Sequence, residues 1–203
     1  MSLLVETIKV VNKRVYNIAY HNIRFNRTRK ELYGIDEAID LRLSINFPKQ
    51  LGSGLYKCRI LYNEKIVDIQ FEQYNAKHIS TLQCVESSID YTYKWVNRKA
   101  LDELYKLRKN SDDILIIKDG LVSDSYYANV AFLKSNKWYS PKQVLLRGTQ
   151  RERLIKKGEI SINDIQYGEI YDYEKIAIFN SMRAFGEIIL PIDAVKPLKS
   201  ADF

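Results

Sequence analysis

The sequence contains few cysteines, no long apolar run and no recognisable leader. Its only cysteines, Cys58 and Cys84, are too few for a disulfide framework and lack the spacing of a metal site. No stretch approaches the roughly 20 apolar residues of a membrane-spanning helix. The first residues contain neither a basic segment nor a small-residue cleavage site, so we expect no signal peptide. These absences favour a protein of the reducing cytoplasm, with no metal and no membrane partner.

The charge balance gives a first indication of the ligands. The chain has 32 Lys and Arg against 25 Asp and Glu, a net charge of +7, which suits either a nucleic acid or smaller anions. The basic residues are dispersed, and no nucleic-acid-binding module is recognisable. We therefore favour a solvated basic surface on an enzyme of anionic ligands and expect no nucleic acid as partner. A basic RNA- or DNA-binding module is the alternative.

The first half of the chain has the periodicity of a small α+β domain, which we place at residues 1–86. An amphipathic pattern from Tyr20 predicts a helix that stops at Gly34. Asp36 is a plausible N-cap for a second helix that reaches Ile45. Alternating or β-branched runs predict the strands of this half: residues 3–11, 14–17, 55–62, 65–74 and 78–85.

The second half, residues 87–203, predicts a larger C-terminal domain. Apolar spacing and a glycine start predict two helices, over residues 99–109 and 148–158. Asp119-Gly120 is a strong hairpin signal. Strands and helices do not alternate strictly, which indicates an α+β fold. The predicted strands of this half are residues 113–118, 130–134, 137–139, 175–180 and 187–190.

Lys94 lies among aromatic and apolar neighbours. Tyr91, Tyr93, Trp95 and Val96 surround it in the sequence and predict partial burial. A partly buried lysine loses its proton more readily than an exposed one, so it can attack a carbonyl group or act as a base. A lysine considered alone is most often a surface charge. The segment therefore marks Lys94 as a candidate and no more.

Two other segments have the features of a phosphate site. Arg24 follows His21 by about one helical turn, so both side chains lie on the same face of the first predicted helix. A forked arginine is well suited to phosphate oxygens. Gly148, Thr149 and Gln150 open a later predicted helix, where backbone N–H groups and the helix dipole favour an anion.

Four segments carry a family resemblance. They are His21-Asn22-Ile23-Arg24-Phe25, Tyr93-Lys94-Trp95-Val96-Asn97-Arg98, Val122-Ser123-Asp124-Ser125-Tyr126-Tyr127-Ala128-Asn129 and Leu146-Arg147-Gly148-Thr149-Gln150-Arg151. In this order they resemble the class IV aminotransferases, the fold-type IV enzymes that use pyridoxal 5'-phosphate (PLP), and within them most of all 4-amino-4-deoxychorismate lyase. The resemblance implies a two-domain α+β fold like that of D-amino acid aminotransferase. Here the fold is expected to be shortened at its N-terminus, because Val5-Glu6-Thr7-Ile8 matches a segment that normally follows a first strand pair.

The resemblance also implies roles for individual residues. Lys94 would hold the cofactor as a Schiff base and move protons. Asp124, where the family usually has Glu, would balance the charge on the pyridine nitrogen, and Asn129 would orient its strand. Arg59, on a predicted strand, is a substrate-carboxylate candidate of low weight. The phosphate would be held by Arg24, Gly148, Thr149, Gln150, Ser181 and Met182.

The resemblance implies a function in folate synthesis. We expect a homodimeric lyase that acts on a small-molecule amino substrate and converts 4-amino-4-deoxychorismate to 4-aminobenzoate and pyruvate. The first alternative is an aminotransferase of branched-chain or D-amino acids with the same cofactor residues. A non-catalytic relative is a second alternative, and intact Lys94, Asp124 and Arg24 argue against it.

Overall fold

The computed structural model describes residues 2–198 and divides into two compact units. Unit 1 contains the chain up to Ala76 and, in addition, Tyr93–Asn97, which we call the lysine segment. Unit 2 contains Lys77–Thr92 and the chain from Arg98 onward. The lysine segment thus belongs to unit 1, although the residues on both sides of it belong to unit 2.

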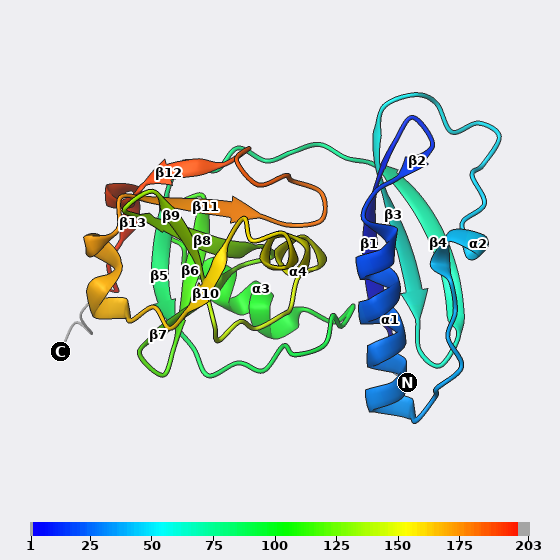
Figure 1. Ribbon diagram of the computed structural model, residues 1–203, viewed down its shortest axis with the longest axis horizontal. Helices are drawn as coiled ribbons and strands as arrows, with labels where there is room; N and C mark the ends of the chain where they lie inside the picture. Colours follow the sequence, from blue (N-terminus) through cyan, green and yellow to red (C-terminus); the bar gives the residue numbers. More distant parts are fainter. Residues whose placement is uncertain (1, 199–203) are drawn as a thin grey trace. The chain divides into compact units, whose positions relative to one another are not determined.

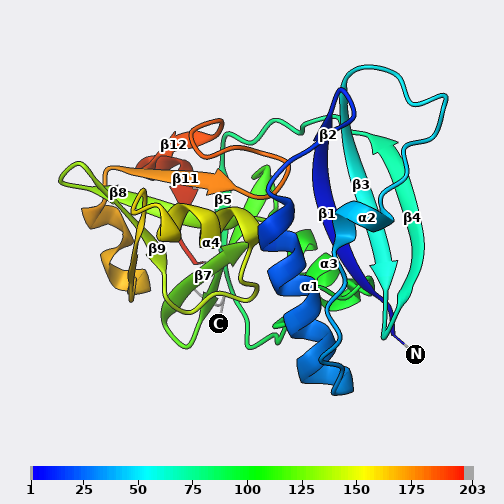
Figure 2. The same cartoon turned by 45° about the vertical axis from the view of Figure 1, so that its right-hand side comes forward.

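Unit 1 is a four-stranded antiparallel sheet with one long helix on one face (Figure 1). The strand order is β2-β1-β3-β4. Helix α1 runs along the sheet (Figure 2). Its apolar side chains pack against the sheet, and the ring centres of Phe25 and Tyr62 lie 4.4 Å apart. The elements of this unit are β1 (Leu4–Val11), β2 (Arg14–Val15), α1 (Ile18–Tyr33), α2 (Leu41–Ser44), β3 (Leu55–Tyr62) and β4 (Ile66–Gln73).

The second predicted helix is much shorter than expected. It was predicted over residues 36–45 with Asp36 as N-cap, but α2 has four residues and is capped by Asp40, whose carboxylate accepts from the Arg42 N–H at 2.9 Å. The preceding chain is extended because side chains of α1 bind its backbone: Asn26 accepts from the Ile39 N–H at 2.9 Å. A tertiary hydrogen bond therefore outweighs the local helix signal.

Unit 2 contains two sheets that share one core. The first has the order β13-β5-β6-β7 and mixes parallel and antiparallel pairs, and the second has the order β10-β9-β8-β11-β12. Side chains of both sheets, such as Leu115 and Phe132, are buried in one cluster. The elements are β5 (Leu82–Glu86), α3 (Lys99–Lys106), β6 (Asp113–Lys118), β7 (Leu121–Ser125), β8 (Asn129–Lys134), β9 (Lys137–Pro141), α4 (Thr149–Lys156), β10 (Ser161–Asn163), β11 (Lys175–Phe179), β12 (Ile189–Pro191) and β13 (Val195–Lys196).

The mixed α+β class is confirmed, with differences at the edges of the elements. The strand predicted over 78–85 is β5, and it pairs with β6, so the chain enters unit 2 at Lys77 and not after residue 86. Helix α3 ends at Lys106, three residues earlier than predicted. Several short elements carry no periodicity of their own and were not predicted: β10, β13 and the 3-10 turns Tyr167–Asp172 and Ile192–Ala194.

Both cysteines are buried free thiols of low reactivity. Cys58 packs in the core of unit 1 and Cys84 in that of unit 2. Burial raises the pKa of each thiol to about 12, so the nucleophilic thiolate is scarce at neutral pH. Within residues 2–198, no group of three or more metal-binding side chains gathers, and no helix is long and apolar enough to cross a membrane.

Candidate functional site

The lysine segment is joined to β1 of unit 1 by backbone hydrogen bonds and one isolated antiparallel bridge. The Lys94 carbonyl accepts from the Val5 N–H at 3.0 Å, and the Val96 N–H donates to the Leu3 carbonyl at 2.8 Å. Trp95 bridges Leu4 in antiparallel fashion. These bonds fix the backbone of Lys94 against the start of β1, and the side chain of Lys94 is half-buried, as its neighbours predicted.

A buried charge cluster lies between β1 and α1. Glu6 is fully buried and accepts from Arg24 Nε at 2.8 Å and Arg24 Nη2 at 2.6 Å. His21 Nδ1 lies 2.6 Å from the second Glu6 oxygen. Burial alone would raise the pKa of Glu6, but the charge of Arg24 and the hydrogen bonds from both partners hold that pKa at about 2. Glu6 is therefore a buried, permanently charged carboxylate.

His21 connects this cluster to Lys94. Burial lowers the pKa of His21, the bond to Glu6 opposes that change, and the positive charges of Arg24 and Lys94 add to it. The imidazole is therefore neutral near pH 7, and the Lys94 ammonium lies close enough to influence it. Unit 1 thus brings together the predicted residues Lys94 and Arg24, with His21 and Glu6 beside them.

Glu6 is the residue whose role the sequence reading missed. It occupies the same face of β1 as Leu4 and Ile8, both buried, so the alternation of the strand directs its carboxylate inward. A carboxylate at an inward position of an apolar strand was the available signal. In this structure Glu6 engages two nitrogens of the Arg24 fork that was expected to bind phosphate. The phosphate role of Arg24 stays a prediction.

Arg59 lies on the other face of the same sheet. Cys58 and Ile60, its neighbours on β3, face α1, so the alternation directs Arg59 away from the helix. Its Nη1 donates to Glu72 on β4 at 3.1 Å, and the Arg59 side chain is 30 % exposed. The low-weight substrate role of Arg59 also stays a prediction.

Asp124 is the central carboxylate of unit 2. It lies on β7, is 4 % exposed, and both oxygens have partners: Asn129 Nδ2 donates to Oδ1 at 2.7 Å and the Leu146 N–H to Oδ2 at 3.0 Å. Burial raises the pKa of Asp124 to about 6, although these bonds and the charge of Arg151 oppose the rise. Asn129 also donates to the Leu146 carbonyl at 2.9 Å, so its amide joins Asp124 to the chain before α4.

The turn before α4 is built so that backbone can approach closely. Gly148 caps α4, and a Cβ added to it would lie 2.0 Å from Asn129 Oδ1, closer than any side chain tolerates. Only glycine therefore leaves room for the amide that holds Asp124. Thr149 and Gln150 follow in the first turn of α4, both almost fully buried. This donor set, with a carboxylate nearby, has the chemistry that a phosphate and a pyridinium require.

Two neighbours of this site have structural partners. Arg151 is buried and donates to Ser140 Oγ at 2.9 Å and to the Pro141 carbonyl at 2.7 Å, which ties α4 to β9. The Met182 N–H, the group expected to contact phosphate, donates to Asn180 Oδ1 at 2.8 Å. Ser181 lies between Asn180 and Met182 in the turn after β11. The phosphate roles of Ser181 and Met182 stay predictions.

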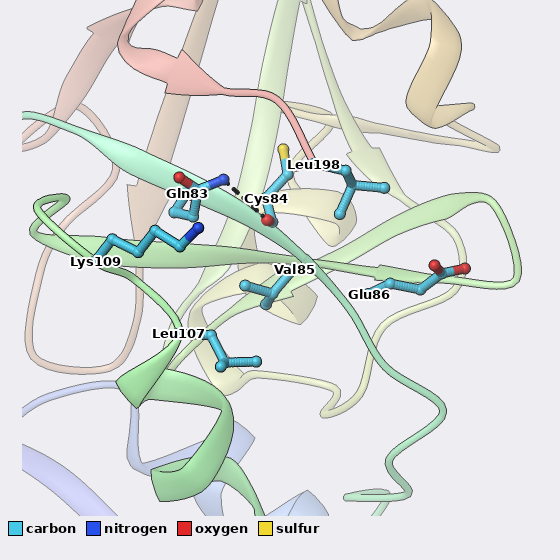
Figure 3. Close-up of a pocket in the computed structure, with 7 residues that line it drawn as sticks. All are labelled: Gln83, Cys84, Val85, Glu86, Leu107, Lys109 and Leu198. Carbon is cyan, nitrogen blue, oxygen red and sulfur yellow. Dashed lines mark hydrogen bonds between the residues drawn. The ribbon is translucent and has the colours of Figure 1, made fainter. Parts of the chain in front are cut away.

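Unit 2 also has a cavity of about 280 Å³ away from these residues. Figure 3 shows its lining, in which Gln83 donates to the Cys84 carbonyl at 3.2 Å. None of the predicted site residues lines it. The lining residues are Gln83, Cys84, Val85, Glu86, Leu107, Lys109 and Leu198.

Comparisons with known proteins agree on the relationship. Residues 3–189 match the model of the amino-transferase class IV family. An uncharacterized protein of Haemophilus influenzae is 36 % identical over 182 residues, which is 88 % of this chain and 97 % of that protein. The predicted resemblance is thereby confirmed.

Solved structures extend the comparison to the fold. A proposed 4-amino-4-deoxychorismate lyase from Haemophilus somnus has a TM-score of 0.80 and 30 % identity, covering 91 % of this chain and 98 % of its own. A proposed amino-acid aminotransferase from Mesorhizobium loti has a TM-score of 0.79 at 16 % identity, covering 94 % of this chain and 99 % of its own. The second likeness is one of fold alone. The predicted fold class is confirmed.

Proposed function

Because the chain belongs to the amino-transferase class IV family, we propose that it is a lyase that converts 4-amino-4-deoxychorismate to 4-aminobenzoate and pyruvate. The family confirms the predicted enzyme class, a PLP-dependent lyase or aminotransferase, and with it the cofactor PLP. The choice of reaction is supported by the likeness to the H. somnus protein, which extends over nearly its whole length.

One observation carries the cofactor assignment to named residues. Asp124 is a buried carboxylate whose hydrogen-bond donors are neutral, an amide and backbone N–H groups, with the charge of Arg151 near it. Bound PLP supplies an electron sink, provided that its pyridine nitrogen stays protonated. A carboxylate without a cationic hydrogen-bond partner is the group that stabilises such a pyridinium, and the pyridinium in turn favours the charged form of Asp124. We assign this role to Asp124.

The other roles follow the chemistry of each side chain. Lys94 would hold the cofactor through its amine, and it would take a proton from the ring carbon of the substrate while the enolpyruvyl group leaves to become pyruvate. Hydrogen bonds to β1 fix the backbone of Lys94, so the point from which its side chain extends is defined. We assign the phosphate to the Gly148–Gln150 turn and to Arg24, with Ser181 and Met182 beside them, and a substrate carboxylate to Arg59.

The proposal includes the setting of the enzyme. We propose a homodimer that acts in folate synthesis, because the family resemblance implies both, and we place it in the cytoplasm because its two cysteines make no disulfide framework. Sedimentation of the PLP-loaded protein tests the dimer, since a mass of one chain at micromolar concentration would exclude it. Loss of growth without 4-aminobenzoate, in cells that lack the gene, tests the pathway.

The assignment of Lys94 is tested by chemical trapping. Borohydride treatment of the yellow PLP-loaded protein should fix the cofactor to Lys94, and mass spectrometry should locate it there. Lys99→Ala is the matched control, because Lys99 is an exposed lysine at the start of α3. Label on another lysine, or a colourless protein, would overturn the assignment and favour a non-catalytic relative.

The reaction itself is tested with two substrate classes. Formation of 4-aminobenzoate and pyruvate from 4-amino-4-deoxychorismate should be rapid in the wild type. Asp124→Asn should retain PLP yet lose turnover by roughly a hundredfold or more, since the amide cannot balance a pyridinium. Amino-group transfer from branched-chain or D-amino acids, with no lyase activity, would replace the proposed reaction by the aminotransferase one.

A further inference from the structure

The arginine that directly follows the lysine segment has an unusual set of contacts within unit 2. Arg98 is the first residue after the segment and the N-cap of α3. Its Nη2 donates to the Tyr126 carbonyl at 2.6 Å, and its guanidinium carbon lies 4.7 Å from the centre of the Tyr126 ring. The guanidinium carbon also lies 5.5 Å from the centre of the ring of Tyr91, which is buried, and Arg98 Nη1 donates to the Tyr91 hydroxyl at 3.4 Å. Arg98 thus contacts two tyrosine side chains and a carbonyl oxygen.

The contacts of Tyr126 make it a firm support for Arg98. Its ring stacks on Tyr105 of α3 at 4.3 Å and 23°, and its hydroxyl donates to Asp102 Oδ1 at 2.5 Å. Tyr105 is in turn fixed by a bond from its hydroxyl to the Asp112 carbonyl at 3.0 Å. Arg108 lies over the opposite end of the stack, 4.2 Å from the Tyr105 ring. Tyr126 is therefore held on both faces and at its hydroxyl.

Arg98 donates a hydrogen bond to the turn between Asp124 and Asn129. The orientation of the Asp124 carboxylate depends on this turn. Tyr126 directly follows β7, two residues after Asp124, and the turn ends at Asn129, which holds Asp124. The turn is closed by the Ser125 N–H, which donates to the Ala128 carbonyl at 2.9 Å. The hydrogen bond from Arg98 to the Tyr126 carbonyl therefore restrains the short connection between Asp124 and Asn129, the residue whose amide binds Asp124.

We propose that Arg98 is a positioning residue, which fixes the chain directly after Asn97 to the turn between Asp124 and Asn129. This inference rests on the proposed function. Arg98 touches none of the reacting groups named above, and it acts through the backbone on which they are mounted. The planar fork is needed, because one side chain must donate to a carbonyl and to a tyrosine hydroxyl while it lies over the Tyr126 ring, which the compact ammonium of lysine cannot do.

The test compares Arg98→Gln with Arg108→Gln. Both variants remove a cation from the same aromatic stack, but only Arg98 adjoins the lysine segment. In the protein without PLP, hydrogen exchange of the peptide spanning residues 91–98 should become faster in Arg98→Gln and stay at the wild-type rate in Arg108→Gln. The rate at which PLP becomes covalently attached should fall roughly ten- to a hundredfold in Arg98→Gln only, the scale of a small misplacement of a reacting group.

Two results would overturn the inference. The first is wild-type exchange and attachment rates in Arg98→Gln. The second is an equal change in both variants, which would show that the stack has only a general stabilising role. If Arg98→Gln does not fold, Arg98→Lys is measured instead; it should show the same two changes in part, and wild-type values for it would count against the proposal. Failure of the proposed function would appear in the wild type, as absence of label on Lys94, whereas failure of this inference appears only in the variants.

Discussion

The two units each contain a buried carboxylate, and the two are held in opposite ways. Glu6 in unit 1 faces the charged Arg24 and accepts a hydrogen bond from His21, and its pKa is lowered to about 2. Asp124 in unit 2 faces neutral donors, and burial raises its pKa to about 6. Glu6 is thus neutralised within the protein, whereas Asp124 lacks a cationic hydrogen-bond partner. Burial by itself does not mark a carboxylate as functional; the charge of its partners separates a structural acid from one that is prepared for a cationic ligand.

Removal of the structural acid should have the largest effect on stability. Glu6→Gln leaves the guanidinium of Arg24, which is 6 % exposed, without its counter-charge. We expect the free energy of unfolding to fall by about 3–5 kcal/mol, the usual result of breaking a buried ion pair on one side. Urea unfolding followed by circular dichroism measures it.

A control and a double variant sharpen this expectation. Glu72→Gln removes an acid whose ion pairs with Lys57 and Arg59 lie in a partly exposed position, and it should cost about 1 kcal/mol or less. Glu6→Gln combined with Arg24→Gln should be less destabilising than the sum of the single changes, because no charge is left unpaired. Strict additivity would show that the pair does not act as a unit.

The second carboxylate should appear in the dependence of stability on pH. The pKa of Asp124 is higher in the folded protein than in the unfolded chain, so the folded state binds more protons between about pH 4 and 6. Its stabilising contribution is therefore present below pH 4 and lost as the pH rises through 6, an effect on the order of 2–3 kcal/mol. Glu6 has the opposite sign, because its contribution is present above about pH 4.5 and lost as the pH falls toward 2.

In the protein without PLP, the unfolding free energy of Asp124→Asn should decline less steeply between pH 4 and 6 than that of the wild type. The decline should not vanish, because burial also raises the pKa of Asp113 to about 6 in the same unit. Urea midpoints measured at intervals over pH 4–7 provide the test. A profile identical to that of the wild type would show that Asp124 does not titrate in this range, and the contrast between the two acids would fail.

The smallest expected effect concerns the support of Asp124. Gly148→Ala places a methyl group against Asn129 Oδ1 and should displace the amide from Asp124. We expect a loss of about 1–3 kcal/mol in unfolding free energy from overpacking, with weaker PLP binding. Gly168→Ala is the control, since a Cβ there meets nothing within 4 Å. Equal PLP affinity in both variants would mean that this close approach has no part in cofactor binding.

Turns and helix ends that depend on adjacent residues could be predicted from the sequence. The hairpin turn at Asp119-Gly120 is found where it was predicted, and both residues have positive φ. Ser135 and Asn136, between the predicted strands 130–134 and 137–139, also have positive φ. Gly34 ends α1 in the left-handed conformation, as the glycine signal indicated. These features depend on the backbone conformations that one or two residues can adopt, and the residue types alone indicate those conformations.

The remainder required contacts between distant residues. The short α2 depends on asparagines of α1, and the pairing of Trp95 with Leu4 joins chain segments that no local pattern connects. The partners of Arg24 could not be predicted either, because a forked arginine suits a phosphate and a carboxylate equally well. The candidate residues were therefore identified from motifs, while their hydrogen-bond partners came only from the fold.

The pairing of the lysine segment with β1 has a consequence for the order of folding. During synthesis the first 76 residues emerge without the segment that bridges β1, because that segment is Tyr93–Asn97. The contacts of unit 1 cannot be complete until β5 of unit 2 has been made. Contacts that span so much chain form slowly, since the loop between them must first be closed. We therefore expect the pairing that fixes the backbone of Lys94 to form slowly during folding.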